Sequence, residues 1–265
     1  AAMHLLLIHQ NFPGQFRDLG PAWLAAGHRL TAIGNTSSLA DSAAWNGLEH
    51  FHYTWPEDHD PSADERGVAV AQLCRQLHSD GVVPDVVIAH SGWGEALQLH
   101  TVWPAIPRVV LPELWGSAEA LGYGFDPALP SALPNHQPTA AWIAAQNSIS
   151  RMAIEQASAA LVPCIAQKRS FPPDLRQRIA VVPEGLPMQR YSGPPPASLQ
   201  LGDCVVAPAA PLVTFVSRHL EPLRGLRQAL QAWPMVLEQR PDAQLLLVGL
   251  EDAGGYGLET PQGPS

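Results

Sequence analysis

Two arginines lie where the chain turns from a strand into a helix. In the segment VTFVSRHLEPLRGL, an apolar run suited to a buried strand precedes Arg218, and Arg224 and Gly225 precede a helical pattern. If the strand belongs to a parallel sheet, both guanidinium groups can converge over its carboxyl end, where open α/β sheets bind ligands. Two arginines there would neutralise a diphosphate through bidentate pairing with phosphate oxygens. Taken alone, they could equally be solvated loop residues with Glu221 as a salt-bridge partner.

A second candidate anion site lies near the N-terminus. The segment HQNFPGQF has Gly14 as its one glycine, just before an expected helix whose free N–H groups and dipole favour an anion. A tight turn that needs glycine explains the residue equally well. The fingerprint G-x-G-x-x-G is absent, and TAIGNTSS after the second apolar run offers no acid for a ribose, so NAD is not expected. The single lysine, Lys168, is not at a strand end, so Schiff-base chemistry is poorly supported.

Two further patterns have simpler explanations than chemistry. A metal could be chelated by residues of EHFHYTWPEDHD, namely His50, His52, Glu57, Asp58, His59 and Asp60. A metal site would need a second pair of ligands at helical or hairpin spacing, and no such pair is found. These residues are therefore better explained as the polar residues of a loop. Ser91 in AHSGW lacks the flanking glycines of a nucleophile elbow, so a serine hydrolase is not supported.

Three other groups are assigned to packing or to a solvated surface. Trp93 and Trp103 are expected to pack in the core or against a helix rather than to stack on a base. The basic cluster could contact an anionic acceptor or a membrane, but a solvated face is favoured; it comprises Lys168, Arg169, Arg176 and Arg178.

Short apolar runs alternate with longer helical patterns along the chain, which is typical of βαβ units and a parallel sheet. Strands are expected at 4–9, 28–33, 85–90, 108–114, 159–164 and 178–183. They are too continuous for a sheet with one wet face, so helices should cover both faces. Between the first two runs, apolar residues from Phe16 to Leu24 recur at helical spacing and Gly27 suits a helix C-cap. Further helical patterns span 66–77, 93–103 and 140–155.

A change in composition suggests two domains. Residues 186–211 are rich in proline and small residues and have no periodicity, as expected of a linker. A strand (212–217), a helix to about 238 and a strand (244–249) then follow. We therefore expect an N-terminal Rossmann-like domain (3–185), a linker (186–211) and a partial second domain (212–265), with a ligand held between the two domains.

Composition limits the functions that the chain can have. At 265 residues, its apolar and charged fractions are those of an ordinary globular protein. The formal net charge of −9 argues against a nucleic-acid-binding surface and against strong attraction to anionic lipid. Three widely spaced cysteines fit a reducing cytosol, and the sequence has no 18-residue apolar stretch. These features predict a cytoplasmic protein, with peripheral attachment at the inner membrane as an option.

Several segments resemble one enzyme family. VTFVSRHLEPLRGLRQALQAWPMVLEQRPDAQLLLVG is similar to the donor-site segment of family 4 retaining glycosyltransferases of the GT-B fold, which usually reads G-R-L-x-x-x-K-G, a helix, then R-P-x-A-x-L-x-I-V-G. The family's first βαβ unit resembles HQNFPGQFRDLGPAWLAAGHRLTAIG, and its histidine-bearing fourth strand resembles DVVIAHSGWGEA. The end of its first domain resembles ASAALVPCIAQKRSFP together with IAVVPEGL. The motifs occur in the family's order over nearly the whole chain.

The resemblance implies roles for particular residues. Arg218 and Arg224 match the basic pair that binds the donor diphosphate, with arginine replacing the usual lysine, and Gly225 follows that pair. Gly14 matches the loop glycine near the diphosphate, and His90 matches the histidine that reaches the sugar. Ser217 stands where glycine is usual. The implied catalytic residues are thus His90, Arg218 and Arg224.

The resemblance also implies a reaction. It is the retaining transfer of a sugar, of hexosyltransferase type, from a UDP- or GDP-linked donor to an acceptor hydroxyl, without a metal or other cofactor. The acceptor could be a glycan, a lipid-linked molecule or a small molecule. Catalysis would depend mainly on electrostatic stabilisation of the departing nucleotide diphosphate.

Other functions stay open. The family's second domain normally continues, with a glycine-rich turn and an E-x7-E motif that do not occur before Ser265. We therefore expect a truncated GT-B protein whose 265 residues alone are inactive. Its C-terminal unit should expose apolar strands, and it should pack against the first domain or against another copy in a homo-oligomer. The alternative is a non-catalytic GT-B fragment that binds a ligand without turnover. A GT-B epimerase or a phosphorylase is less well supported.

Overall fold

The structure is a computed structural model of the 265-residue chain. It describes residues 1–37, 43–56, 59–121, 140–194, 198–206, 211–220 and 224–250. The chain divides into two compact units, which are described separately. The N-terminal unit comprises Ala1–Ala120 with Thr139–Pro187, and the C-terminal unit comprises Leu121–Pro138 with Met188–Ser265.

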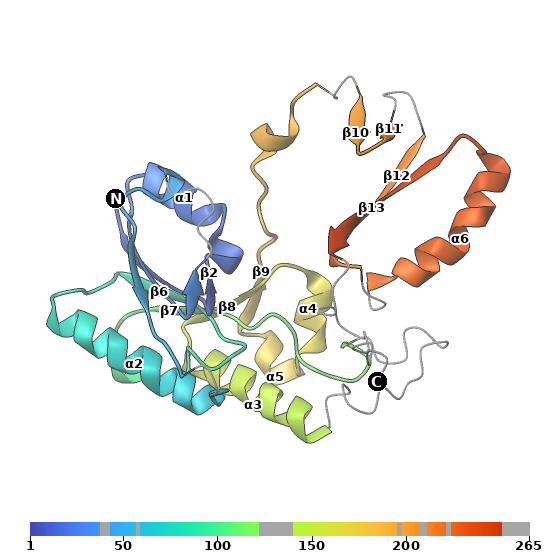
Figure 1. Ribbon diagram of the computed structural model, residues 1–265. Coiled ribbons are helices and arrows are strands. Elements are labelled where there is room, and N and C mark those ends of the chain that lie inside the picture. Colours follow the sequence, from blue (N-terminus) through green and yellow to red (C-terminus); the bar gives the residue numbers. More distant parts are fainter. Residues whose placement is uncertain are drawn as a thin grey trace. The chain divides into compact units, whose positions relative to one another are not determined.

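A parallel sheet of seven strands forms the centre of the N-terminal unit (Figure 1). In spatial order the strands are β5 (Glu49–His52), β3 (Arg29–Gly34), β1 (His4–Ile8), β6 (Val86–His90), β7 (Arg108–Leu111), β8 (Ala159–Val162) and β9 (Ile179–Val181). The chain starts in β1, adds β3 and β5 on one side, and then returns to add β6 on the other side. The strand order therefore reverses between β1 and β6, which makes the carboxyl ends of these two strands the topological switch point where ligands of such sheets bind.

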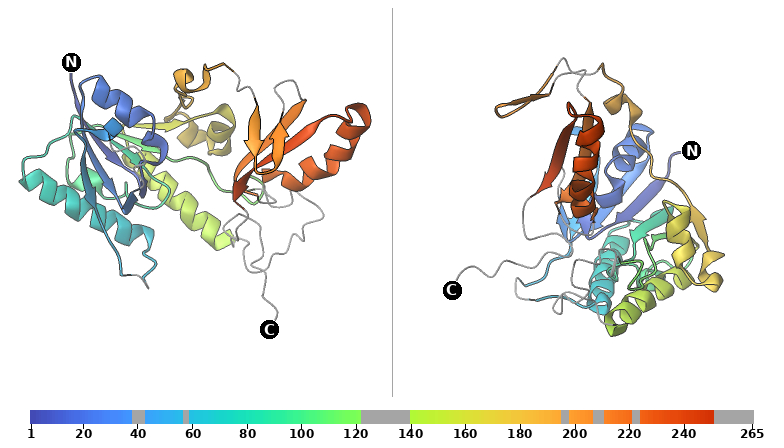
Figure 2. Two further views of the ribbon diagram at one scale, coloured as in Figure 1. Left: turned by 45° about the horizontal axis from the view of Figure 1, so that its top comes forward. Right: turned by 90° about the vertical axis from the view of Figure 1, so that its right-hand side faces the viewer.

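Helices cover both faces of this sheet, as the continuous apolar runs predict (Figures 1 and 2). Alternate residues of β1 point to opposite faces: Leu5 and Leu7 join a core with Phe16 and α1 (Leu19–Ala25), whereas Leu6 and Ile8 join a core with the two long helices. Those helices are α2 (Ala63–Ser79) and α3 (Ala140–Gln156). Ser62 begins α2 with a capping box, because its hydroxyl accepts from the Glu65 N–H and the Glu65 carboxylate accepts from the Ser62 N–H.

Shorter elements connect the strands of the N-terminal unit. They are β2 (Asn11–Phe12), which pairs with β4 (Thr36–Ser37), the 3-10 turns η1 (Gly14–Phe16), η2 (Ala43–Trp45) and η3 (Leu99–Thr101), and the helices α4 (Ile165–Ser170) and α5 (Pro173–Arg176). The helix expected at 66–77 is α2, and the one expected at 140–155 is α3.

The segment 93–103 is not the expected helix. It forms turns and the single 3-10 turn η3, and Gly94 takes a φ of 111°, which a right-handed helix excludes. Gly94 also approaches the Ala63 backbone so closely that a Cβ there would overlap it. Trp103 is buried and its Nε1 donates to His78 Nδ1 at 3.0 Å, so it packs in the core as expected, whereas the Trp93 side chain is exposed.

The C-terminal unit has a parallel β–α–β arrangement of β12 (Leu212–His219), α6 (Leu226–Gln239) and β13 (Gln244–Leu250), as the sequence predicts. It also contains η4 (Met188–Tyr191) and an antiparallel hairpin of β10 (Leu199–Leu201) and β11 (Cys204–Val206). The hairpin lies inside the segment expected to be an unstructured linker. Its tight turn contains Gly202 at a φ of 56°, a conformation that glycine permits.

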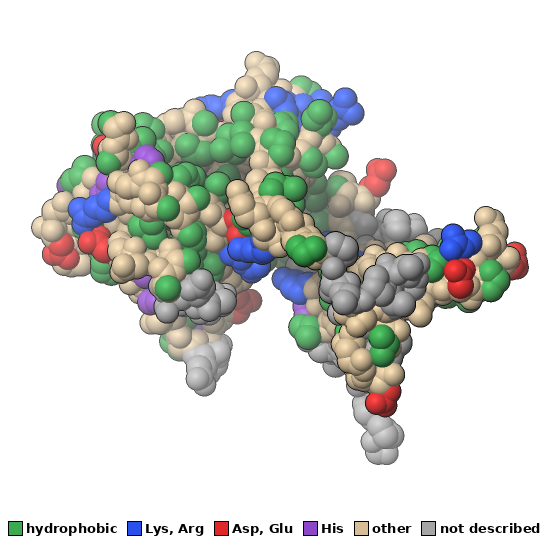
Figure 3. All heavy atoms as spheres, turned by 90° about the horizontal axis from the view of Figure 1, so that it is seen from above, with side chains coloured by type: hydrophobic (Ala, Val, Ile, Leu, Met, Phe, Trp, Pro, Cys, Tyr) green, Lys and Arg blue, Asp and Glu red, His purple; other side chains and the backbone are tan. Residues whose placement is uncertain are grey.

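Many apolar side chains of the C-terminal unit are exposed to solvent, among them Val216, Met235 and Leu250. Hydrophobic side chains are also visible at the surface in the space-filling view (Figure 3). Within the described residues, no helix is both long and apolar enough to cross a bilayer.

Candidate active site

The carboxyl ends of β1, β6 and β7 bring together four polar or small residues: His9, Gly14, His90 and Glu113. We call them the switch-point cluster. His9 follows β1 directly, His90 is the last residue of β6, and Glu113 comes two residues after β7. Because β1 and β6 pair in register and β7 pairs with β6, their carboxyl ends meet at one edge of the sheet.

His9 and His90 lie side by side at the centre of this cluster. Their ring centroids are 4.9 Å apart, and both side chains are buried. His9 Nδ1 accepts a hydrogen bond from the Asn11 N–H at 3.0 Å. Burial and the neighbouring His90 lower the pKa of His9 to about 4, so its ring is neutral near pH 7.

Gly14 packs directly against the His9 ring. It adopts a φ of 47°, in the left-handed region, and a Cβ at this position would overlap the ring. The structure therefore requires glycine here for two reasons, backbone conformation and space. The sequence predicted that Gly14 and His90 approach one another, and His9 is the side chain that lies against both.

Glu113 is the solvent-facing member of the switch-point cluster. Its Oε1 lies 3.3 Å from His90 Nε2 and accepts a hydrogen bond from Gln15 Nε2 at 2.8 Å. The hydrogen bond from His90 holds the pKa of Glu113 below its usual range. About half of the side chain is exposed, whereas His90 beneath it is 3% exposed. A ligand at this edge would therefore meet the Glu113 carboxylate before the His90 ring.

The backbone of Glu113 is strained. It has a φ of 56°, which is uncommon for a residue other than glycine, asparagine or aspartate. Backbone strain of this kind costs about 1–3 kcal/mol and often occurs at functional sites. The strained residue thus places a negative charge over His90 at the switch point.

Arg218 and Arg224 lie in the C-terminal unit, around one strand-to-helix turn. Arg218 is the penultimate residue of β12 and is exposed; Arg224 immediately precedes Gly225, which caps α6 at a φ of 83°. The pairing of β12 with β13 passes from Val216–Val248 to His219–Leu250, so an extra residue forms a bulge next to Arg218. Bulges re-aim neighbouring side chains and are frequent next to active sites. Glu221, the alternative salt-bridge partner, lies outside the described residues.

Ser217 lies at the bulge beside Arg218. Its side chain is half-buried, and among the described residues its Oγ has no hydrogen-bond partner. The carbonyl of Ser217 would contact a Cβ at Gly249 at 2.7 Å, so β13 needs its glycine where it passes the bulge.

Two residues of the switch-point cluster were not assigned from the sequence. His9 and Glu113 follow predicted strands directly, in HLLLIH and RVVLPEL, and polar residues at the carboxyl ends of parallel strands are the available signal. Within the described residues, no group of three His, Cys, Asp or Glu side chains has a metal-binding arrangement. Glu57 and Asp58 of the metal alternative lie outside them. The rings of His50 and His52 contact each other at an interplanar angle of 50°, with centroids 4.1 Å apart.

The basic cluster around α4 and α5 is largely engaged by the backbone. Arg176 donates to the carbonyl oxygens of Phe171 and Arg169, and Arg178 donates to that of Ala157. Ser91 is fully buried, with no hydrogen-bond partner for its Oγ, which does not suit a nucleophile.

The fold defines an α/β protein with a Rossmann-like parallel sheet, and the switch-point cluster is its candidate ligand site. A family model described as "Glycosyl transferase family 4 group" matches residues 27–191. The chain belongs to this family. The predicted family is thereby confirmed, and so is the predicted fold class, an α/β protein of GT-B type with a Rossmann-like first sheet and a following β–α–β unit.

Solved structures with a similar chain path are distant in sequence. A UDP-N-acetylglucosamine 2-epimerase from Rickettsia bellii is 9% identical, with 94% of this chain and 62% of that chain covered and a TM-score of 0.44. A UDP-glucosyltransferase from Polygonum tinctorium is 11% identical, with 94% and 72% covered and a TM-score of 0.48. The calicheamicin glycosyltransferase CalG4 is 16% identical, with 96% and 68% covered and a TM-score of 0.45.

These likenesses are too distant to support an argument about activity. The chain spans 62% of the length of the epimerase from Rickettsia bellii. No curated protein matches the chain.

Proposed function

We propose that the protein is a retaining glycosyltransferase that moves a sugar, of the hexosyl type, from a nucleotide diphosphate sugar to an acceptor hydroxyl. The main support is the family match over residues 27–191. The switch-point cluster adds to it, because an open parallel sheet binds its ligand where the strand order reverses.

In this proposal the C-terminal unit binds the donor diphosphate. Arg218 and Arg224 supply the positive charge at the bulged end of β12, and the backbone at Gly225 begins α6 beside them. Charge-assisted pairs between guanidinium and phosphate are about twice as strong as neutral hydrogen bonds. The same charges would stabilise the nucleotide diphosphate as it leaves the sugar, which is the step at which preorganised electrostatics accelerates transfer.

The N-terminal unit would contact the sugar side of the donor. Gly14 offers backbone without a side chain, and His90 with Glu113 offers polar groups at the same edge. His9 is neutral near pH 7 and supports both neighbours by packing. The acceptor hydroxyl would attack on the face that the leaving group vacates, so the product keeps the anomeric configuration of the donor.

The proposal assigns no catalytic metal and no resident cofactor. A nucleotide sugar linked to UDP or GDP is the co-substrate, and the acceptor is a glycan, a lipid-linked molecule or a small molecule. Activity should therefore survive EDTA. Activity that is lost with EDTA and restored by a divalent cation would contradict this part of the proposal.

The test is incubation of the protein with UDP- and GDP-sugars that carry a ¹³C label at the anomeric carbon, followed by NMR of the products. Release of UDP or GDP with a labelled product of retained configuration supports the proposal. Inversion of configuration would overturn the assignment of a retaining enzyme. Nucleotide binding without turnover would favour the alternative, a GT-B protein that binds its ligand and does not catalyse transfer.

A further inference from the structure

A second polar pocket lies in the N-terminal unit, outside the switch-point cluster. It has a volume of about 390 Å³ and opens to solvent between the end of β3, the loop after β5 and the first turns of α2. Its lining includes Asn35, Trp55, His59, Asp60 and Arg66. Because β3 and β5 run parallel to β1, the pocket lies at the carboxyl edge of the sheet, on the β5 side of the switch point.

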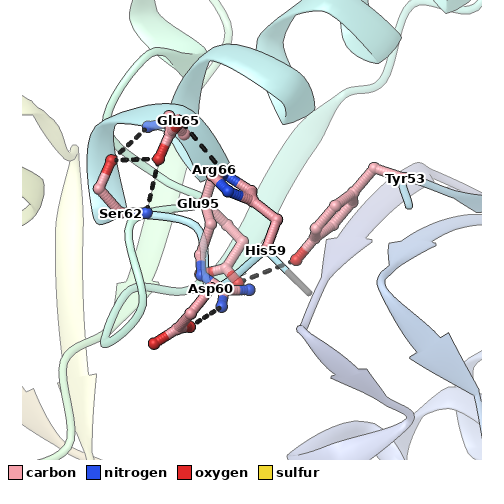
Figure 4. Close-up of polar contacts among 7 residues, drawn as sticks. All are labelled: Tyr53, His59, Asp60, Ser62, Glu65, Arg66 and Glu95. Atoms are coloured by element: carbon pink, nitrogen blue, oxygen red, sulfur yellow. Dashed lines mark hydrogen bonds and ion pairs between the residues drawn. The ribbon is translucent and has the colours of Figure 1, made fainter. Parts of the chain in front are cut away.

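Arg66 extends from α2 toward Asp60 and Glu95 (Figure 4), and it lines this pocket. The residue is 8% exposed, and its buried Nη1 atom has no hydrogen-bond partner among the residues that the structure describes. Its Nη2 lies 3.9 Å from Oδ1 of Asp60, whose side chain is fully exposed, so the ion pair is weak. A buried donor without a partner destabilises the folded state, and more so when the group is charged.

Trp55 supplies a second donor of the same kind. Its indole Nε1 is buried and has no hydrogen-bond partner. The ring is fixed between two neighbours, at centroid distances of 6.1 Å from Tyr53 and 5.8 Å from His59. His59 is itself engaged, since its Nε2 lies 3.3 Å from Glu65 Oε1. Among the described residues, neither Arg66 Nη1 nor Trp55 Nε1 has an acceptor.

Glu95 is a buried acidic side chain close to Arg66, and among the described residues its Oε2 atom also has no hydrogen-bond partner. Tyr53 OH donates to Glu95 Oε1 at 3.0 Å, and both side chains are buried (Figure 4). Burial raises the pKa of Glu95, so this side chain keeps its proton to a higher pH than an ordinary glutamate does. Among the described residues that line the pocket, Asp60 is the acidic one, and its side chain is fully exposed.

We propose that this pocket binds a small molecule through an oxyanion, a carboxylate or a phosphate, that accepts from Arg66 Nη1 and Trp55 Nε1. An oxyanion supplies the acceptors that the two donors lack, and its charge matches the guanidinium. Asn35 at the rim can donate its side-chain amide to the same group or to a neighbouring hydroxyl. The identification of this molecule as the acceptor substrate rests on the proposed function, whereas the binding itself does not.

The indole resonance of Trp55 gives a direct test. ¹H–¹⁵N NMR spectra of the whole chain would be recorded during titrations with inorganic phosphate and with acetate, at constant ionic strength set by chloride. Trp55→Phe assigns the Trp55 indole peak by removing it. We expect that peak to shift and saturate with phosphate, with acetate or with both, and the pattern tells which oxyanion the pocket accepts. No saturable shift with either probe would overturn the proposal.

Variants then locate the binding. Arg66→Gln should weaken binding at least tenfold, whereas Arg75→Gln, which removes the same charge from an exposed position on the same helix, should leave it unchanged. If Arg66→Gln does not fold, Trp55→Phe serves instead, because it keeps an aromatic ring and removes the indole donor. It should weaken binding about tenfold, followed at the Asn35 amide. Equal loss in Arg66→Gln and Arg75→Gln would show general charge attraction and refute a defined site.

These probes are not sugar donors, so the result is independent of transfer. If oxyanions bind here and no sugar is transferred, the proposed function fails and the pocket stands. If sugar is transferred and no oxyanion binds, the pocket proposal alone fails.

Discussion

The switch-point cluster and the Arg218–Arg224 turn both lie where a parallel strand ends, yet they hold their polar groups in different ways. His9 and His90 are almost completely enclosed by packing, and Gly14 fits against the His9 ring with no space for a side chain. Arg218 projects from an exposed strand next to a bulge. Both regions have the same sequence pattern, an apolar run followed by polar residues and a glycine. They differ in how far their polar side chains are buried.

This difference shows how each region should respond to mutation. Substitutions of the packed members of the switch-point cluster, His9, Gly14 and His90, should change the free energy of unfolding, because the two histidines are buried in the core and Gly14 packs against the His9 ring. Substitution of Arg218 should change ligand binding and leave stability nearly unaltered, since exposed side chains contribute little to stability. The predictions below test that contrast, from the largest expected effect to the smallest.

Gly14→Ala should lower the free energy of unfolding by about 4 kcal/mol. The left-handed φ costs an alanine about 1–2 kcal/mol, and overlap with the His9 ring adds an overpacking cost of about 1–3 kcal/mol. Gly27→Ala is the matched control, because Gly27 also has a positive φ but has open space around its Cβ position. Urea unfolding of both variants measures the difference. Equal losses would mean that the contact with His9 has no energetic consequence.

His9 should make stability depend on pH between about 7 and 4. Its folded pKa of about 4 lies below the unfolded value of about 6.5, so the unfolded chain binds the proton first as pH falls. Stability is therefore retained above the unfolded pKa and is lost by about 3 kcal/mol as pH falls toward 4.

The variant His9→Phe keeps an aromatic ring and cannot be protonated, so its loss of stability between pH 7 and pH 4 should be smaller than that of the unmodified protein. Chemical unfolding across this pH range measures both proteins. Parallel pH profiles would contradict the buried neutral state of His9.

Glu95→Gln should make the protein relatively more stable at high pH. Burial raises the folded pKa of Glu95, so the folded state holds the proton more tightly than the unfolded state does. The glutamate therefore destabilises the fold increasingly as pH rises above its unfolded pKa, and glutamine avoids this while still accepting from Tyr53 OH. Thermal unfolding at pH 5 and pH 8 should show a gain from the substitution that is larger at pH 8. A larger gain at pH 5 would reverse the assigned direction.

Much of the fold of the N-terminal unit follows from the sequence because its central strands are buried on both faces. The runs HLLLIH and DVVIAH give β1 and β6, and helical spacing gives α2 and α3 nearly to their ends. The helix predicted at 93–103 is wrong, because Gly94 has a φ of 111°, which a right-handed helix excludes. The β10–β11 hairpin was missed because composition alone does not reveal a short pairing between proline-rich flanks.

The candidate site was predicted in part. His90 came from the resemblance, Gly14 came from the strand-to-helix turn as well as from the resemblance, and the structure places both against His9. Glu113 was missed because its role depends on a strained φ and on the pairing of β7 with β6, neither of which is visible in the residue order. The pocket at Arg66 depends on which buried donors lack partners, which only side-chain geometry reveals.

Calorimetry with UDP and GDP tests the account of the arginine pair most directly. Arg218→Ala and Arg224→Ala should each weaken nucleotide diphosphate binding by about 2 kcal/mol, through loss of a charge-assisted pair. Arg240→Ala, an exposed arginine of the same unit that pairs with Asp242 at 3.1 Å, should bind as the unmodified protein does. Arg218→Ala should also keep its free energy of unfolding within about 0.5 kcal/mol. Unchanged affinity for both nucleotides in both Arg218→Ala and Arg224→Ala would contradict the assignment of the donor site.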